Sequence, residues 1–383
     1  MARKSNIPFN KPYLTGKETD YISDVLNLRK ISGNGKYTKL CQTFFENNYG
    51  FKKVLLTTSC TDALEMTAIL ANIELGDEII VPSFTFVSTA VAFVRQGAKI
   101  VFADSCIDNP NIDASKIESL ITSKTKAIVP VHYAGIACDM DKIMELAHKY
   151  NLLVIEDAAQ AIDSYYVGKD GIKRPLGSIG HMAAFSFHET KNIISGEGGM
   201  ITINDSRFIN RAEIIWEKGT NRSEFLRGEV NKYGWVDTGS SFLPSEIIAA
   251  FLWAQIENLA EIQDKRKKLW DYYYSAIKNL NLTSVKLPFI PHFATNNGHM
   301  FYLVCSDIEE RDKLISKLKD KGFHSVFHYI SLHSSDFYIS KHDNRELCNS
   351  DNYTNCLVRL PFFFELEKSE VDSIIACIKH NIN

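Results

Sequence analysis

The sequence lacks the features that would assign it to a membrane or secreted class. Its 383 residues contain no apolar run near the ~18 residues that a membrane-spanning helix requires. The first ten residues carry two early cations but no apolar segment, so we expect no signal peptide. With 45% hydrophobic and 23% charged residues, the composition is that of an ordinary globular protein, which we expect to be cytoplasmic.

A strong charge of one sign and a cysteine pattern are also missing. The formal net charge of -3 provides no basic surface, so we expect neither nucleic acid nor a membrane as a partner. No CxxC pair or close Cys/His set occurs, which argues against a disulfide framework and predicts no metal site. The eight cysteines are scattered over positions 41, 60, 106, 138, 305, 348, 356 and 377.

Glycines are absent from the place where a dinucleotide-binding loop would need them. No Gly-x-Gly-x-x-Gly follows the first β-rich run, which makes a nucleotide-dependent oxidoreductase the weakest alternative.

Short β-rich runs alternate with helix-length segments in the first two thirds of the chain. Alternation with nearly continuous apolar strands predicts an α/β fold with a large, mostly parallel, seven-stranded sheet covered on both faces. The glycine-rich residues 196–199 between the last two runs predict a tight return instead of a helical crossover. The runs are 54–58, 78–82, 99–104, 127–132, 152–157, 182–187 and 200–204.

The pattern changes near residue 252. A long charged amphipathic helix is predicted over about 252–280, followed by short strands and a terminal helix. We therefore predict a large domain over 1–252, with an N-terminal arm over 1–14, and a smaller C-terminal α/β domain over 253–383.

Two residues 34 positions apart suggest cofactor chemistry. Asp157 ends one apolar run and Lys191 lies just past another. Pyridoxal phosphate (PLP) needs a lysine amine to form a Schiff base with its aldehyde, and a carboxylate to keep its pyridine nitrogen protonated. Taken singly, Asp157 could instead cap a helix and Lys191 could be a surface cation.

A separate segment suggests a phosphate site. Ser59, Cys60 and Thr61 lead from the first strand directly into a helix, where free backbone amides and hydroxyls bind anions. Ser186, at a neighbouring strand end, would add a hydroxyl. The alternative is a simple Ser/Thr helix cap.

Three further residues would complete the cofactor pocket. Gln160, one helical turn after the acid, could support the cofactor ring or its 3'-oxygen. Phe86 is our choice for a ring stacked on the pyridine, although both aromatics of 82–86 could belong to the core. His132, at another strand end, could be a pocket wall or a core histidine.

The combination resembles a known family. PSFTFVSTA (82–90), IEDAAQA (155–161) and FSFHETKN (185–192) followed by GEGG (196–199) resemble the DegT/DnrJ/EryC1/StrS sugar aminotransferases, from about residue 8 to the C-terminus. The resemblance implies a fold type I, aspartate-aminotransferase-like PLP enzyme. It implies a homodimer with active sites built from both subunits. It also implies that Lys191 is the Schiff-base lysine, Asp157 the pyridinium partner, Ser186 with 59–61 the phosphate site, and Phe86 the stacking ring.

Two motifs point to one branch of that family. KGTNRSEF (218–225) and FHYISLH (327–333) look most similar to the dTDP-4-amino-4,6-dideoxygalactose transaminases. That branch transfers the amino group of L-glutamate to dTDP-4-keto-6-deoxyglucose, giving 2-oxoglutarate, with pyridoxamine phosphate as the intermediate cofactor form. The implied role is deoxysugar biosynthesis for lipopolysaccharide O-antigen. The gluco epimer, a 3-keto sugar and a UDP-sugar stay open as alternatives.

Other relatives are dehydratases with histidine in place of the lysine, and Lys191 argues against them. Because Lys191 and Asp157 are both present, a non-catalytic protein on the same scaffold is also disfavoured.

The remaining predicted site residues concern the substrate and the second subunit. His328 and Tyr329 would close the sugar pocket. Ser241 matches a position where many relatives place an asparagine on the phosphate of the other subunit. A polar segment is predicted to bind the nucleotide diphosphate, across the dimer, or else to be a solvated loop. Its candidate residues are Arg222, Arg227, Lys232 and Tyr233.

Overall fold

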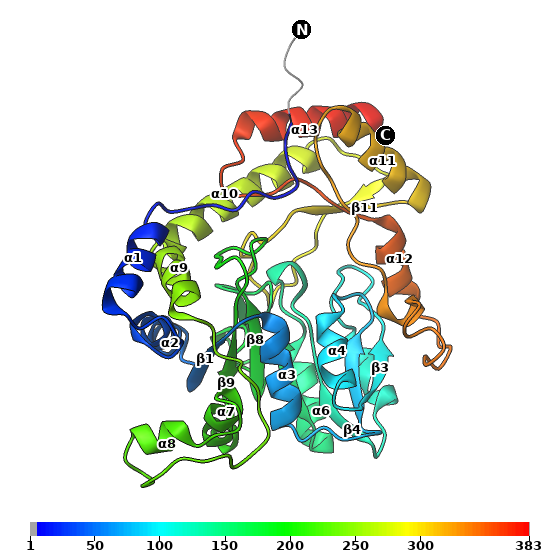
Figure 1. Cartoon of the computed structure of the whole chain (residues 1–383). Coiled ribbons are helices and arrows are strands. Elements are labelled where there is room, and N and C mark those ends of the chain that lie inside the picture. The colour runs from blue at the N-terminus through cyan, green and yellow to red at the C-terminus, as the bar shows by residue number, and fades with distance from the viewer. Residues whose placement is uncertain (1–5, 383) are drawn as a thin grey trace.

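The computed structural model describes residues 6–382, so residues 1–5 of the predicted arm and residue 383 lie outside the described residues. A seven-stranded sheet with the order β1-β9-β8-β5-β4-β2-β3 occupies the centre (Figure 1). Each predicted run overlaps one of these strands, and the α/β prediction is confirmed. The strands are β1 (Lys53–Thr57), β2 (Glu78–Pro82), β3 (Lys99–Ala103), β4 (Thr125–Ile128), β5 (Leu153–Asp157), β8 (Met182–Ser186) and β9 (Gly199–Ile203).

The sheet is parallel except at β9. Strands β3, β2, β4, β5 and β8 run in one direction, whereas β9 is antiparallel to both β8 and β1. Ser186 pairs with Gly199 in this register, so the predicted tight return over 196–199 is confirmed. A short hairpin of β6 (Tyr165–Val167) and β7 (Lys173–Pro175), which the sequence pattern did not predict, lies apart from the sheet.

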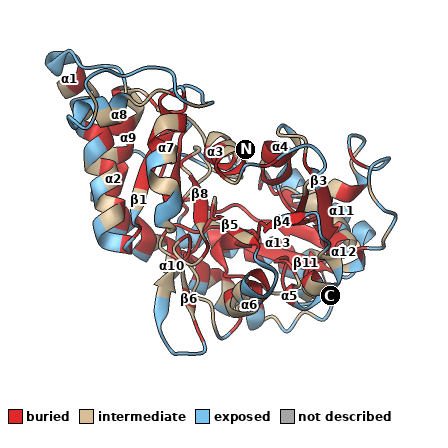
Figure 2. Ribbon diagram, turned by 90° about the horizontal axis from the view of Figure 1, so that it is seen from below, coloured by how far each residue is buried: buried red, intermediate tan, exposed pale blue. Residues whose placement is uncertain are grey.

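Alternating strand residues enter two cores, one on each face of the sheet. Leu55 and Ile155 pack under α3, α4 and α7, whereas Leu56 and Val154 pack under α2, α6 and α9. Figure 2 shows the buried strands between helices whose outer faces are exposed. The helices are α2 (Lys36–Tyr49), α3 (Cys60–Leu70), α4 (Ser88–Val94), α6 (Met140–Tyr150), α7 (Ile209–Trp216) and α9 (Glu246–Glu257).

A smaller sheet with its own core lies over the carboxyl ends of the parallel strands (Figure 1). The predicted short strands and terminal helix are both present. Its strands are β10 (Val285–Lys286), β11 (Tyr302–Cys305) and β12 (Leu357–Arg359), and its helices are α10 (Leu259–Lys278), α11 (Ile308–Asp320), α12 (Cys348–Cys356) and α13 (Lys368–Asn381).

The prediction of one long helix over 252–280 is wrong. The chain leaves the helical conformation at Asn258, which separates α9 from α10. The apolar side chains of α9 face the core of the large sheet, whereas most of those of α10 face the core of the small sheet. Two helices are needed because one straight helix could not reach both cores. The division at 252/253 remains a prediction.

The N-terminal arm lies against the small sheet. Ile7 exchanges backbone hydrogen bonds with Gly322 and His324, at 2.8 and 2.9 Å, and Tyr13 stacks on Phe364 with ring centroids 3.8 Å apart. The following helix α1 (Glu18–Leu28) packs on α9 of the large sheet. The arm therefore links the two sheets. No helix within residues 6–382 has both the length and the apolar character needed to cross a bilayer.

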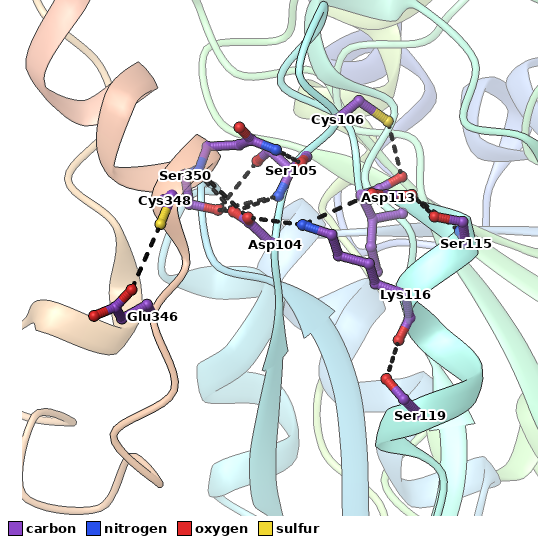
Figure 3. A network of polar contacts seen from close by, with 12 residues as sticks. Asp104, Ser105, Cys106, Asp113, Ser115, Lys116, Ser119, Glu346, Cys348 and Ser350 are labelled. Carbon is purple, nitrogen blue, oxygen red and sulfur yellow. Dashed lines mark hydrogen bonds and ion pairs between the residues drawn. The ribbon is translucent and has the colours of Figure 1, made fainter.

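The Asp104 carboxylate ties α12 to the large sheet (Figure 3). Just after β3, it accepts hydrogen bonds from the Ser350 amide and hydroxyl, at 2.8 and 3.0 Å, and from the Asn349 amide at 3.3 Å. Lys116 Nζ lies 3.3 Å away. Burial opposes ionisation, but the hydrogen bonds from Ser350, Asn349 and Ser105 outweigh it and hold the pKa of Asp104 below its usual range.

We expect Asp104→Ala to lower the free energy of unfolding by about 3 kcal/mol at neutral pH, because buried donors of α12 lose their charged acceptor. Since the folded-state pKa is depressed, this contribution is present above the unfolded pKa of 3.8 and is lost as pH falls through the lower folded value. Denaturant titrations between neutral pH and pH ~2 measure both effects.

Asp113→Ala is the matched control, because Asp113 caps the short helix α5 (Ala114–Ile117) and also faces Lys116, but does not touch α12. We expect it to cost about 1 kcal/mol. Equal losses for the two variants would contradict a special role for Asp104.

Candidate active site

A cavity of 420 Å³ lies between the carboxyl ends of the parallel strands and the small sheet. Parallel strands gather ligand sites at this edge, because their carboxyl ends meet there. The structure brings most of the predicted site residues into its wall. They are Ser59, Cys60, Thr61, Phe86, Asp157, Gln160, Ser186, Lys191, His328 and Tyr329.

Asp157 ends β5 and is buried in the cavity wall. Its carboxylate accepts a hydrogen bond from the Thr89 hydroxyl at 2.7 Å and another from the Ala159 amide at 3.1 Å. Burial raises the pKa of Asp157 despite these bonds. A cation placed against this carboxylate would be strongly favoured, as the protonated ring nitrogen of the expected cofactor would be.

Lys191 follows β8 in a turn closed by a 2.9 Å hydrogen bond from its amide to the His188 carbonyl. Its partly buried side chain lines the cavity, and within residues 6–382 it has no carboxylate close enough for an ion pair. Burial lowers the pKa of Lys191 to about 8, and the Arg359 guanidinium acts in the same direction. A sizeable fraction of the amine is therefore neutral and nucleophilic near neutral pH.

The helix α3 presents its N-terminus to the cavity. Ser59 caps it by accepting a 3.0 Å hydrogen bond from the Asp62 amide, whereas the first amides, those of Cys60 and Thr61, have no partner inside the helix. A Cβ on Gly199 would lie 2.5 Å from the Cys60 nitrogen, so only glycine lets β9 pass this close to the loop. With the Thr61 and Ser186 hydroxyls, this end of the cavity fits a phosphate.

The opposite wall is aromatic. Phe86 is 56% exposed and contacts Tyr329, with ring centroids 5.8 Å apart. Gln160 donates to the Tyr329 hydroxyl at 3.2 Å and accepts from the Ala134 amide at 2.6 Å, so both ends of its amide are already engaged. His328 is exposed at the rim, where desolvation and Arg359 lower its pKa to about 4, so its imidazole is neutral.

Five predicted residues lie outside this cavity. Arg222 pairs with Glu217 at 3.4 Å, and Arg227 pairs with Glu213 at 2.6 Å and Glu229 at 2.7 Å. Lys232, Tyr233 and Ser241 are exposed on the same segment. Its helix α8 (Arg222–Leu226) lies at the opposite end of the molecule from α13 (Figure 1). Within one chain these residues do not reach the cavity, and their roles stay predictions that require a second subunit.

Three cavity-related residues were missed by the sequence analysis. The Thr89 hydroxyl donates a hydrogen bond to Asp157. Thr89 follows Thr85 by four residues, a spacing that could have suggested that the two hydroxyls meet, and their oxygens lie 3.0 Å apart. Buried His299 and Arg359 both line the cavity, but they lie over 100 residues beyond Lys191 in short motif-free segments. His132, left open between core and pocket, is a core residue bonded to Glu156 at 2.9 Å.

Comparisons with known proteins identify the family of the chain. The model of the DegT/DnrJ/EryC1/StrS aminotransferase family matches residues 12–379. The GDP-perosamine synthase of Caulobacter vibrioides is 32% identical over 99% of both chains.

Solved structures match across the whole chain as well. The aminotransferase from Psychrobacter cryohalolentis has a TM-score of 0.90 and 26% identity, covering 97% of this chain and 98% of its own. The PLP and PMP forms of a Streptococcus pneumoniae protein assigned to the sugar aminotransferases each have a TM-score of 0.88 and 25% identity, with 98% coverage of both chains.

We expect the Lys191 amine of the cofactor-free protein to titrate near pH 8, because burial disfavours its charged form. Reductive methylation over a range of pH, followed by mass spectrometry of the peptide that contains Lys191, measures this midpoint. In unfolded protein the midpoint should move to the ordinary lysine value of about 10.4. The same midpoint in both states would contradict the desolvated environment.

Proposed function

The chain belongs to the DegT/DnrJ/EryC1/StrS aminotransferase family, and we propose that it aminates dTDP-4-keto-6-deoxyglucose at C4 with L-glutamate as amino donor. As a member of this family it is a PLP-dependent sugar aminotransferase. The proposed products are dTDP-4-amino-4,6-dideoxygalactose and 2-oxoglutarate. The observation that carries the proposal is the shared cavity of Lys191, Asp157 and the α3 N-terminus, beneath the motif that contains His328 and Tyr329.

The cavity suits each chemical group of the cofactor. When bound, pyridoxal phosphate supplies an aldehyde that carries the amino group and a ring that takes up an electron pair. We assign the phosphate to the amides of Cys60 and Thr61 with the Ser186 hydroxyl, and the ring nitrogen to Asp157. Phe86 is exposed beside this space, and its flat face is available for stacking.

Lys191 Nζ is the group that moves protons. With a pKa near 8 it accepts the Cα proton of the amino donor, and in the second half-reaction it delivers a proton to the sugar carbon that receives the amine. The Thr89 hydroxyl and the Ala159 amide hydrogen-bond Asp157 and hold its carboxylate in the cavity wall, where it would face the ring nitrogen of the bound cofactor. Phe86, Tyr329 and Phe9 line the cavity with aromatic surface and limit the access of water.

The choice of sugar rests on two sequence motifs. KGTNRSEF and FHYISLH are similar to the galacto-configured transaminase branch, and the second contributes His328 and Tyr329 to the cavity. The printed name of the Caulobacter relative contains a GDP-linked sugar, so GDP joins UDP as an alternative nucleotide. Use of the product in lipopolysaccharide synthesis and a cytoplasmic location stay predictions.

A homodimer would bring the remaining predicted residues to the cavity. The segment of Arg222, Arg227, Lys232, Tyr233 and Ser241 also exposes large apolar side chains, which commonly mark an interface. The exposed fractions are 63% for Leu226, 85% for Trp235 and 56% for Val236. We propose that this segment of each subunit completes the partner's site. A monomer with full activity would contradict this shared site.

The direct test is the product itself. The protein with PLP, L-glutamate and dTDP-4-keto-6-deoxyglucose should yield a product whose proton NMR spectrum shows an axial amine at C4. An equatorial amine would assign the gluco epimer. Amination of only a 3-keto, GDP- or UDP-linked sugar would replace the proposed substrate.

We expect Lys191→Ala to lower turnover by about 10⁴-fold, because the proton-transferring amine is lost. Borohydride should also fail to attach the cofactor covalently, which mass spectrometry detects in the wild type. Lys267→Ala is the control, since Lys267 lies outside the cavity in a 3.0 Å ion pair with Asp163. Wild-type turnover by Lys191→Ala would refute the mechanism.

A further inference from the structure

The motif FHYISLH contributes His328 and Tyr329 to the cavity, but its last residue, His333, does not line it. His333 is 9% exposed and lies between the end of β2 and the helix α12. Its Nδ1 atom lies 2.7 Å from the Ser83 hydroxyl, and its Nε2 atom lies 3.5 Å from the Asp351 carboxylate. The two ring nitrogens therefore contact two different parts of the chain.

The partners of this imidazole indicate its tautomer. The Ser83 hydroxyl oxygen accepts a hydrogen bond from the His333 amide at 3.3 Å, so its own O–H is free to donate to Nδ1. The Nε2 atom then carries the proton and faces the Asp351 carboxylate. Burial lowers the pKa of His333, and the neighbouring His342 acts in the same direction, so the imidazole is neutral near neutral pH. One accepting and one donating nitrogen satisfy both partners.

Further hydrogen bonds hold the residues that precede His333. The Leu332 amide donates to the Ser83 carbonyl at 2.9 Å. The Ser331 amide and hydroxyl both contact the Thr354 hydroxyl of α12, at 2.9 and 2.7 Å. Residues 331–333 are thus bound on one side to the large sheet and on the other side to α12.

The two segments that His333 joins carry the aromatic wall of the cavity. Phe86 follows Ser83 by three residues, and Tyr329 precedes His333 by four. The two rings contact each other with centroids 5.8 Å apart, and Tyr329 also approaches Phe84 at 6.0 Å. Because the connections from Ser83 and His333 to these rings are short, the hydrogen bond between Ser83 and His333 limits how far the rings can separate.

We propose that His333 is a positioning residue that fixes the aromatic wall of the sugar pocket through its hydrogen bond with Ser83. It acts through His328 and Tyr329 and does not touch the cavity itself. The inference rests on the proposed function, in which these two residues close the sugar pocket. The alternative is a purely structural role, in which loss of His333 destabilises the fold without distinguishing the sugar from the amino donor.

Two variants of His333 and one of Ser83 separate these roles. His333→Phe keeps a ring but removes both nitrogens, whereas His333→Asn offers an amide oxygen in place of Nδ1. Ser83→Ala removes the same hydrogen bond from the other side. Each variant is mixed in its pyridoxamine phosphate form with the keto-sugar nucleotide alone, and in its PLP form with L-glutamate alone. The absorbance of the cofactor then reports each half-reaction separately.

His342→Asn is the matched control. His342 belongs to the same buried cluster, since its ring centroid lies 5.0 Å from that of His333. Its Nε2 atom donates to the Arg345 carbonyl at 2.9 Å, and within residues 6–382 it makes no hydrogen bond to Ser83. We expect this variant to lower the stability of the cluster but to leave both half-reactions unchanged. Thermal unfolding measures the stability of every variant.

For His333→Phe and Ser83→Ala we expect the half-saturating concentration of the keto-sugar nucleotide to rise about 10-fold, the factor that one lost hydrogen bond produces. The limiting rate of that step and the glutamate half-reaction should stay within about threefold. His333→Asn should recover most of the affinity, and the double variant of His333→Phe with Ser83→Ala should be little worse than either single variant. An equal loss in the glutamate half-reaction, no recovery by His333→Asn, or an equal effect of His342→Asn would overturn the proposal.

Amide hydrogen exchange of the cofactor-free protein supplies a readout that needs no substrate. His333→Phe should speed exchange in peptides that contain residues 327–333 more than in those that contain 337–345, and His342→Asn should do the reverse. Unchanged exchange over 327–333 in His333→Phe would overturn the positioning role. A wild-type protein that does not react with dTDP-4-keto-6-deoxyglucose would instead refute the substrate named in the proposed function, and the exchange result would still decide the role of His333.

Discussion

Burial of the Asp157 carboxylate imposes a requirement on the groups around it, because an ionised acid removed from water is destabilised by several kcal/mol unless it is compensated. The protein compensates it only partly, with the Thr89 hydroxyl and the Ala159 amide. The cavity is therefore electrostatically incomplete without a cationic ligand group. Burial has the opposite effect on the pKa of Lys191, which it lowers, so that this amine loses its proton more readily. Together they leave a space that favours a ligand with a positive ring and an electrophilic carbon.

The residues at strand ends could be predicted from sequence because parallel strands converge at one edge. Asp157, Ser186 and the start of α3 each follow an apolar run directly, and local pattern alone places them together. Arg359 and His299 could not be found in this way. Their position depends on how the small sheet packs over the large one, which no local periodicity encodes. The break at Asn258 was missed for the same reason, because it reflects which core each helix faces.

The exposed segment around Arg222 marks a different limit. Its basic and aromatic residues suggested a substrate site, yet in one chain their partners are Glu217, Glu213 and Glu229. A pattern of residue types indicates which ligands a segment can bind. It does not indicate whether the segment contributes to the active site of its own subunit or to that of a second subunit. The small sheet that covers the cavity, in contrast, belongs to the same chain. It is held by the hydrogen bonds of Asp104 to α12 and by the arm that carries Phe9.

Gly199 limits which positions can change when proteins with this fold evolve to use different substrates. Strand β9 passes so close to the start of α3 that any side chain at 199 would displace the backbone that faces the anion end of the cavity. Residues that contact the sugar can be exchanged one at a time as substrates change. A glycine at this position belongs to the architecture, so it should persist through changes of sugar, nucleotide and stereochemistry alike. Substitutions designed to change the substrate should therefore leave this strand crossing untouched.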